Sequence, residues 1–231
     1  MAEDLAGWTE RARPPRTPMQ GRTVRLEPLD PERHGAALFR AAEGPGADPR
    51  LWDWMAVGPF GSEAAFRAWL DPLPASEDPL FFAILTEPDG VPRGMASFLR
   101  STPAHGVIEI GHIWLGVGLQ RTTAATEAMW LLARRAFDEL GYRRLEWKCD
   151  TRNARSRRTA LRLGFAFEGI FHQHMVIKGE NRDTAWFALL DRDWPRADAA
   201  FRAWLDPANF GPDGQQRRRL EEIRASLAGP T

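Results

Sequence analysis

The sequence predicts a mixed α/β domain over residues 21–194, in which helices flank a central sheet. Two observations support this fold class. Segments with strand-like alternation and segments with helical spacing follow one another as strand, two helices, three strands, helix, strand, helix and two strands. Caps, prolines and glycines mark the boundaries between them. With 231 residues and a hydrophobic fraction of 43%, the chain can bury a sizeable core.

The first half of the domain begins with a strand and two helices and ends in a hairpin. Asp30 and Pro31 are a typical start for the first helix, while Ser62 opens the second and Pro72 ends it. Turn residues between two apolar runs predict the hairpin. The predicted elements are a strand at 21–29, a helix at 30–44, an aromatic loop at 50–60, a helix at 62–73 and a hairpin at 79–101.

The second half contains the helix with the strongest pattern, at 123–141. Its apolar residues recur at helical spacing, and Gly141 ends it. Alternation of polar and apolar residues predicts the other strands, and an asparagine at the start with a glycine at the end predicts the remaining helix. They are strands at 106–117 and 142–150, a helix at 153–164, and strands at 165–177 and 183–191.

The two ends of the chain differ from the domain. Residues 1–20 are rich in arginine and proline, which predicts a flexible N-terminal arm. Residues 195–231 predict a C-terminal helical extension, with an amphipathic helix at 194–207 and a highly charged helix at 214–229. The extension can pack against the domain or against a second subunit. For the charged helix, a solvated surface is the simpler interpretation.

Composition argues against several classes of protein. Lysine plus arginine equals aspartate plus glutamate at 31 each, so no basic excess indicates a nucleic-acid partner. The single cysteine, Cys149, cannot form an internal disulfide, and the histidines lack metal-ligand spacing, so no metal is expected. No apolar run is long enough to cross a membrane, and the N-terminus lacks a signal-peptide core. We therefore expect a cytoplasmic protein.

The junction at 116–126 joins a strand to a helix with small and hydroxylated residues. The first turn of a helix has unpaired N–H groups and the positive end of the helix dipole. Arg121 adds a positive charge, and the hydroxyls of Thr122 and Thr123 can donate. Free N–H groups at a helix N-terminus, with a nearby arginine and hydroxyl donors, are a common arrangement for binding a phosphate. The simpler alternative is a threonine cap beside a solvated arginine.

A second basic cluster surrounds the predicted helix start at 153–164. Asn153 and Ser156 occupy that start. Two helix N-termini, each following a strand and each rich in arginine, suit a long ligand with several phosphates. A solvated arginine surface with an asparagine cap remains the alternative. The arginines of this cluster are Arg152, Arg155, Arg157, Arg158 and Arg162.

Three segments resemble the GNAT superfamily of acetyl-CoA-dependent N-acetyltransferases, and most of all its ribosomal-protein N-terminal acetyltransferase branch. They are EIGHIWLGVGLQRTTAATEAM at 109–129, LGYRRLEWKCDTRNARSRRTALRLGFAFEG at 140–169 and KGENRDTAWFALL at 178–190. The resemblance implies a mixed, mostly antiparallel sheet that splays open. It also implies acetyl-CoA as co-substrate and an amine as acceptor, either a protein N-terminus or a small molecule. This branch often forms dimers, so a homodimer is a further expectation.

The same resemblance implies where the co-substrate binds. Backbone groups of Ile113, Trp114 and Leu115 correspond to those that hold the pantetheine arm. Asn153, Ser156 and Arg158, in the second of the three segments, are further contacts of the co-substrate that the resemblance implies. The pyrophosphate loop has threonine and alanine where the family usually has glycine. Its residues are Gln120, Arg121, Thr122, Thr123, Ala124, Ala125 and Thr126.

For catalysis, the resemblance implies that Ser156 protonates the departing thiolate. The tyrosine that many members use corresponds to Ala160 here. Glu109 is the favoured general base, and a structural carboxylate paired with arginine is the alternative interpretation. Strict strand alternation predicts that Glu109 and His112 point to opposite faces and cannot share one site. The glutamate that serves as base in the branch corresponds to Met175, and the adjacent His174 is expected to face away.

The aromatic loop falls where the family builds its acceptor pocket, so Trp52, Trp54 and Phe60 are candidate pocket residues. An acetyl-cysteine intermediate on Cys149 is disfavoured, because a free cysteine within strand alternation is commonly buried. Two other classes stay open beside the enzyme. One is a catalytically degenerate CoA-binding sensor, and the other is an interaction module built on the C-terminal helix.

Overall fold

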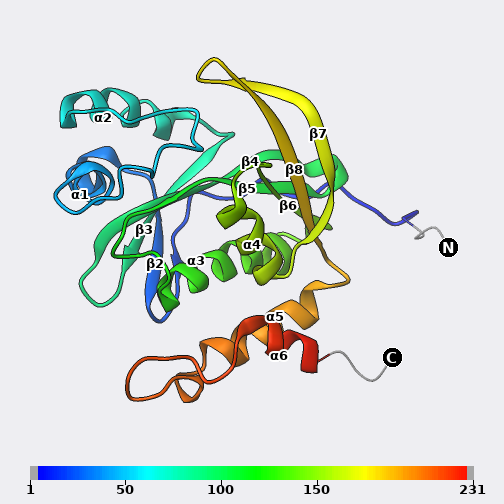
Figure 1. Ribbon diagram of the computed structural model, residues 1–231. Helices are drawn as coiled ribbons and strands as arrows, with labels where there is room; N and C mark the ends of the chain where they lie inside the picture. Colours follow the sequence, from blue (N-terminus) through cyan, green and yellow to red (C-terminus); the bar gives the residue numbers. More distant parts are fainter. Residues whose placement is uncertain (1–4, 228–231) are drawn as a thin grey trace.

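The computed structural model describes residues 5–227 and contains an eight-stranded sheet with helices on both faces (Figure 1). The strands are β1 (Met19–Gln20), β2 (Val24–Pro28), β3 (Leu80–Thr86), β4 (Val91–Thr102), β5 (Val107–Leu115), β6 (Arg144–Asp150), β7 (Ala166–Ile177) and β8 (Glu180–Leu190). The helices are α1 (Pro31–Glu43), α2 (Glu63–Leu70), α3 (Thr123–Arg134), α4 (Ala154–Leu163), α5 (Trp194–Leu205) and α6 (Leu220–Ser226). The short helical turns are η1 (Leu73–Ala75), η2 (Pro103–His105), η3 (Arg135–Glu139) and η4 (Pro207–Asn209).

The predicted order of elements from the first strand to the last is confirmed, and β1 is an added strand. The sheet order is β1-β2-β3-β4-β5-β6-β8-β7. Neighbouring strands are antiparallel except for β5 and β6, which are parallel. The mixed, mostly antiparallel sheet that the sequence predicts is therefore confirmed.

Each face of the sheet has its own core. Under α1 and α2, residues such as Leu38, Phe66 and Phe81 form one buried cluster. On the opposite face, Ile110 and Leu132 belong to a larger cluster beneath α3 and α4 (Figure 1). We call these the α1/α2 face and the α3/α4 face. No helix in the described part of the chain combines the length and apolar character needed to cross a membrane.

The described residues of the N-terminal arm are attached to the domain, in contrast to the loose arm that composition predicts. Arg11 Nε donates to the carbonyl oxygen of Gly141 at 2.9 Å, and the Tyr142 hydroxyl donates to that of Ala12 at 3.1 Å. The buried Arg135 donates to the carbonyl oxygen of Thr17 at 2.7 Å. Composition alone missed these contacts because each joins residues far apart in the sequence. Residues 1–4 of the predicted arm lie outside the described residues.

The C-terminal extension packs into the core of the α3/α4 face. From α5, Phe201 and Trp204 are buried in the same cluster as the residues of α3, and Leu220 of α6 joins them. Arg224 of α6 donates to the carbonyl oxygens of Arg162 and Leu161, at 2.7 and 3.0 Å, and so satisfies the C-terminal end of α4. The charged helix is shorter than predicted, and residues 228–231 of the extension lie outside the described residues.

Glu127 ties α3 to the turn between β1 and β2. Its buried carboxylate accepts hydrogen bonds from the N–H groups of Arg22 and Thr23, both at 2.7 Å, and from the Thr23 hydroxyl. Glu127→Ala is expected to lower the free energy of unfolding by about 3 kcal/mol, because it removes several hydrogen bonds to a buried carboxylate. Urea denaturation would measure the loss. Glu127→Gln keeps one acceptor oxygen and should lose less; equal midpoints for all three proteins would contradict this role.

Candidate active site

Strands β5 and β6 separate partway along their length. They pair only from Val107 to Glu109 on β5, with Glu109 opposite Glu146 on β6. Beyond this point β5 pairs with β4 and β6 pairs with β8. We call the resulting opening the β5–β6 gap. The edge of β5 from Ile110 to Leu115 is therefore available to an extended ligand, and this opening corresponds to the predicted splay.

A β-bulge at His112 changes which residues of β5 share a face. His112 has a φ of +49°, and the register with β4 shifts between Met95 and Ser97. Ile108 and Ile110 belong to the α3/α4 cluster before the bulge, whereas Trp114 belongs to the α1/α2 cluster after it. Glu109 and His112 therefore lie on the same α1/α2 face. The prediction that they point to opposite faces is wrong, because a bulge inserts one residue into the alternation.

His112 is held as a neutral imidazole beside the gap. Its Nδ1 lies 2.9 Å from Ser97 Oγ, and the hydroxyl of Ser97 donates to the carbonyl oxygen of Gly111 at 3.2 Å. This network is satisfied when Nδ1–H donates to Ser97 Oγ, which leaves a lone pair on Nε2. His112 is exposed at the gap, but the protein atoms around its ring partly desolvate it. This desolvation, with a smaller effect from the positive charge of Lys148, lowers the pKa of His112 below its usual value of 6.5. The side chain is thus suited to accept a proton near neutral pH.

Glu109 is ion-paired at the start of the gap. Lys148 Nζ lies 2.8 Å from its Oε2, and Arg100 Nε lies 3.5 Å from the same oxygen. Only 4% of Glu109 is exposed. Burial raises the pKa of the Glu109 carboxyl, and the positive charge of Lys148 opposes that increase. The favoured base of the sequence analysis therefore lies at the gap, with its carboxylate already paired with two cations.

Ser156 approaches the gap from the other face. It lies in the first turn of α4, and its Oγ accepts a hydrogen bond from Trp147 Nε1 at 2.9 Å. Trp147 and Cys149 both belong to the α3/α4 cluster. Burial raises the pKa of the Cys149 thiol, so this cysteine is a poor nucleophile. The sole tyrosine, Tyr142, is buried against the N-terminal arm.

The loop before α3 presents backbone N–H groups. Arg121 has a φ of +61°, and within the described chain the N–H groups of Arg121, Thr123 and Ala124 have no protein acceptor. The Thr122 hydroxyl donates to the carbonyl oxygen of Leu119 at 2.7 Å and accepts from Ala125 N at 3.1 Å. It acts as the helix cap, so the anion-binding capacity lies in the backbone.

Other residues of the predicted loop are engaged within the protein. Gln120 Nε2 donates to the carbonyl oxygen of Leu115 at 2.8 Å, which fixes the end of β5. The hydroxyl of Thr126 accepts from Arg162 Nη1 at 3.1 Å. Ala124 is buried and Ala125 is half-buried. Access of a ligand to the helix terminus past these small side chains stays a prediction.

The second helix start combines a cap with exposed arginines. Asn153 Oδ1 accepts from Ser156 N at 3.0 Å, which leaves the amide nitrogen of Asn153 free to donate to a ligand. Arg158 is exposed. Arg152 and Arg155 instead bind Asp150 and Asp48, at 2.9 and 3.7 Å. The arginine cluster is therefore only partly available to a ligand.

The predicted pocket residues divide into two groups. Trp52 is 2% exposed, and its ring centroid lies 5.2 Å from that of Phe60 and 5.7 Å from that of Trp114. These rings attach the α1–α2 loop to β5. Trp54 is 37% exposed and lies under the guanidinium of Arg152, at 5.4 Å. Trp54 therefore faces solvent, whereas Trp52 and Phe60 pack within the α1–α2 loop against β5.

The tip of the β7–β8 hairpin contacts the α1–α2 loop, which the sequence analysis missed. Lys178 Nζ donates to the carbonyl oxygen of Trp52 at 2.9 Å. Figure 1 shows this hairpin extending beyond the sheet on the side of α2. On β7 the half-buried His174 bonds to the Thr184 hydroxyl at 2.9 Å and packs near Trp186. The tip of the hairpin and the α1–α2 loop are thus held together by the hydrogen bond from Lys178.

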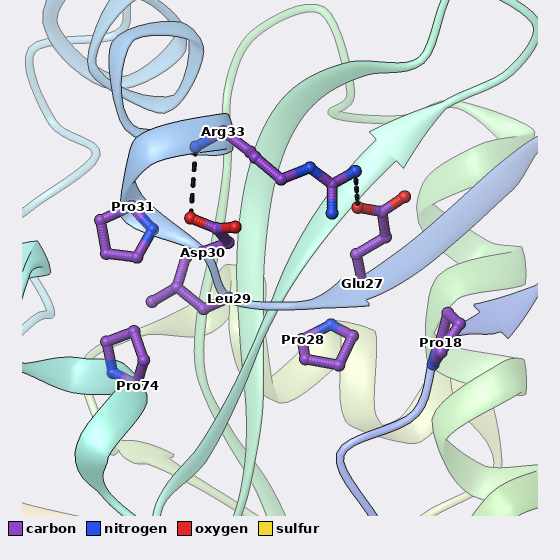
Figure 2. Close-up of a pocket in the computed structure, with 8 residues that line it drawn as sticks. All are labelled: Pro18, Glu27, Pro28, Leu29, Asp30, Pro31, Arg33 and Pro74. Carbon is purple, nitrogen blue, oxygen red and sulfur yellow. Dashed lines mark hydrogen bonds and ion pairs between the residues drawn. The ribbon is translucent and has the colours of Figure 1, made fainter.

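Hollows in the described part of the chain also lie away from the gap. One lies at the end of the sheet where β5 and β6 still pair, and Arg100, Glu146 and Trp186 are among its lining residues. The other lies at the β2–α1 junction and is lined largely by prolines (Figure 2). Its charged groups pair with one another, since Arg33 Nη2 lies 2.8 Å from Glu27 Oε2. The proline-lined hollow is therefore a structural junction.

Comparison with known proteins agrees with this geometry. Residues 23–166 match the acetyltransferase (GNAT) domain family. A solved GCN5-related N-acetyltransferase from Brucella melitensis is 48% identical, with a TM-score of 0.93 over 96% of this chain and 100% of that chain. A Chromobacterium violaceum structure described as a GNAT-family acetyltransferase is 44% identical, with a TM-score of 0.77 over 84% of this chain and 96% of that chain.

A curated relative adds a name from the predicted branch. A Bacillus subtilis protein named as a candidate ribosomal N-acetyltransferase is 29% identical over 106 residues. The match spans 46% of this chain and 57% of that protein. The family match covers more than half of the chain, and the Brucella structure matches nearly all of it. The chain therefore belongs to the GNAT family of acetyltransferases.

Proposed function

We propose that this protein transfers the acetyl group of acetyl-CoA to a primary amine by direct attack in a ternary complex. The observation that carries the proposal is the β5–β6 gap, with Ser156 on its α3/α4 face and His112 on its α1/α2 face. The pyrophosphate binds the N–H groups of Arg121, Thr123 and Ala124, and Asn153 and Arg158 contact the co-substrate at the start of α4. The pantetheine arm lies along the free edge of β5 at Ile113, Trp114 and Leu115.

In the proposed reaction the amine enters on the α1/α2 face and attacks the acetyl carbonyl carbon. Nε2 of His112 accepts the amine proton, because the imidazole is neutral and its Nδ1 is bound to Ser97. The carbon–sulfur bond then breaks, the Ser156 hydroxyl donates its proton to the thiolate, and Ser156 is reprotonated from solvent, to which the remaining amine proton is released. Holding both reactants in one gap removes much of the entropic barrier. Glu109, the base favoured by sequence, instead forms ion pairs that hold Lys148 and Arg100 at the start of the gap.

A charge placed at the start of α3 tests the co-substrate site. Thr123→Glu is expected to weaken acetyl-CoA binding by about tenfold or more, because the carboxylate repels the pyrophosphate. The same acid is expected to keep or raise the melting temperature, because a negative charge is favourable at a helix N-terminus. Calorimetric titration and thermal melts would measure the two effects.

The exposed Ala64, in the first turn of α2, provides the matched control. Ala64→Glu adds the same charge at another helix start and should leave acetyl-CoA affinity unchanged. Equal acetyl-CoA affinities for the parent, Thr123→Glu and Ala64→Glu would contradict the proposed pyrophosphate site at the start of α3. Tight binding of acetyl-CoA without transfer to any amine would instead favour the CoA-sensor alternative.

A further inference from the structure

The chain has only two lysines among its 31 lysine and arginine residues. Lys148 lies on β6 and Lys178 at the tip of the β7–β8 hairpin. All other basic side chains are arginines, which stay protonated and are poor nucleophiles. Lys148 and Lys178 are therefore the side-chain amines that an acetyl group delivered to the gap could meet.

Lys148 is placed where an acceptor amine must approach. The last β5–β6 pair joins Glu109 to Glu146, so Lys148 is the next residue of β6 on the same face. Its neighbours Trp147 and Cys149 belong to the α3/α4 cluster, which puts Lys148 on the α1/α2 face with His112. Its side chain is 10% exposed, and Nζ lies 4.6 Å from the ring centroid of Trp186.

A proton acceptor for the Lys148 ammonium is already in contact with it. Glu109 Oε2 lies 2.8 Å from Nζ, and this buried carboxylate is also 3.5 Å from Arg100. Transfer of one proton to Glu109 would produce a neutral amine beside the gap, the form that attacks a thioester. Lys178 has no such arrangement, because its Nζ donates to the backbone oxygen of Trp52.

We propose that Lys148 is a self-acetylation site, modified by acetyl-CoA bound in the gap when no acceptor amine is present. The inference rests on the proposed function. Glu109 takes one proton from the ammonium, and Nζ then attacks the acetyl carbon. The carbon–nitrogen bond forms, the carbon–sulfur bond breaks, and the second nitrogen proton ends on the sulfur of CoA. The products are an acetamide on Lys148 and free CoA, so no further reactant is needed.

Self-acetylation would change the site that surrounds it. The acetamide carries no charge, so Glu109 would keep Arg100 as its remaining cationic partner among the groups that contact it. The added acetyl group would also occupy the α1/α2 side of the gap. Lys148 thus provides a means by which acetyl-CoA, in the absence of acceptor, would slow the transfer reaction.

The test is mass spectrometry of the full chain incubated with acetyl-CoA and no amine. We expect the intact mass to rise by one acetyl group. Trypsin does not cut after acetyl-lysine, so the modified chain should yield the joined peptide Leu145–Arg152 in place of Leu145–Lys148 and Cys149–Arg152. Lys148→Arg keeps the positive charge and should lose the added mass, whereas Lys178→Arg should retain it.

Parallel measurements separate failure of this inference from failure of the proposed function. Acetyl-CoA binding and transfer to added amines are measured on the same sample. Binding and transfer with an unmodified Lys148 would overturn the self-acetylation and leave the proposed function intact. Equal modification of native and heat-denatured protein would also overturn it, because the fold would then play no part. Absence of both acetyl-CoA binding and transfer would overturn both proposals.

Discussion

His112→Ala is expected to lower kcat by about two to four orders of magnitude, the usual contribution of a general base. Among the described residues, His112 has no charged partner within hydrogen-bonding distance; it contacts Ser97 and the ring of Phe81, whose centroid is 5.2 Å away. Its loss should therefore leave acetyl-CoA affinity and thermal stability close to those of the parent. Steady-state kinetics with a reactive amine, together with calorimetric titration, would show the difference.

The pH profile gives an independent test of the same role. His112 accepts a proton only when neutral, and partial desolvation of its ring, followed by the charge of Lys148, lowers its pKa below 6.5. In the parent, kcat should therefore fall as the pH drops through a value below 6.5. The His112→Ala variant should lose this acidic limb.

Ser97→Ala serves as the graded control for His112. Ser97 is fully buried, and its hydroxyl fixes the orientation of the imidazole ring. Its removal should reduce kcat by about tenfold while keeping the acidic limb, because the base itself remains. If His112→Ala kept the parent's kcat and pH profile, Glu109 would again be the leading candidate for the base.

The order of elements was predictable because most of their signals are local. The cap of α1 at Asp30, for example, is visible in the sequence and accepts from the N–H groups of Glu32 and Arg33 in the structure. The threonine cap that the sequence offers as an alternative for the junction is also present: it is Thr122, with Ala125 N as donor. These caps depend on residues within one turn of each other, so a single sequence contains the necessary information.

The arrangement of the site was less predictable because it depends on partners far along the chain. The bulge at His112 is a shift in the register between β4 and β5, and no sequence pattern around His112 predicts it. The ion pair between Glu109 and Lys148 joins strands that share only a short parallel pairing. Sequence resemblance pointed to Ser156 and the loop before α3, whereas the proposal of His112 in place of Glu109 as the base depends on the paired sheet.

The same distinction applies to the two ends of the chain. Arginine and proline in the arm suggest a loose segment, yet Arg135 and Tyr142 provide buried partners for its backbone. The charged helix near the C-terminus suggests a solvated surface, and much of it is exposed. Its two buried residues, Leu220 and Ile223, are what attach it to the domain.

Removal of residues 194–231 is expected to unfold the protein at 25 °C. The segment contributes six large buried side chains to the α3/α4 core: Trp194, Phe201, Trp204, Leu205, Leu220 and Ile223. At about 1.5–3 kcal/mol for each, their loss amounts to roughly 9–18 kcal/mol. The whole stability of a typical domain is only about 5–15 kcal/mol. Circular dichroism and thermal melting of the truncated chain would show whether a cooperative fold remains.

A shorter truncation after Gly214 separates packing from a partner-binding role. It removes α6 but keeps α5, so two of the six large side chains and the Arg224 contacts to the end of α4 are lost. On the same scale the cost is about 3–6 kcal/mol, and this variant should fold with a lower melting temperature.

The alternative in which the extension is an independent interaction module requires the opposite result. In that case the chain ending at Asp193 would fold cooperatively and bind acetyl-CoA while losing only its assembly. Because Trp130 of α3 donates to Asp198 of α5 at 2.8 Å and Arg162 of α4 lies 4.9 Å from the ring of Trp204, we expect the domain to fail without α5.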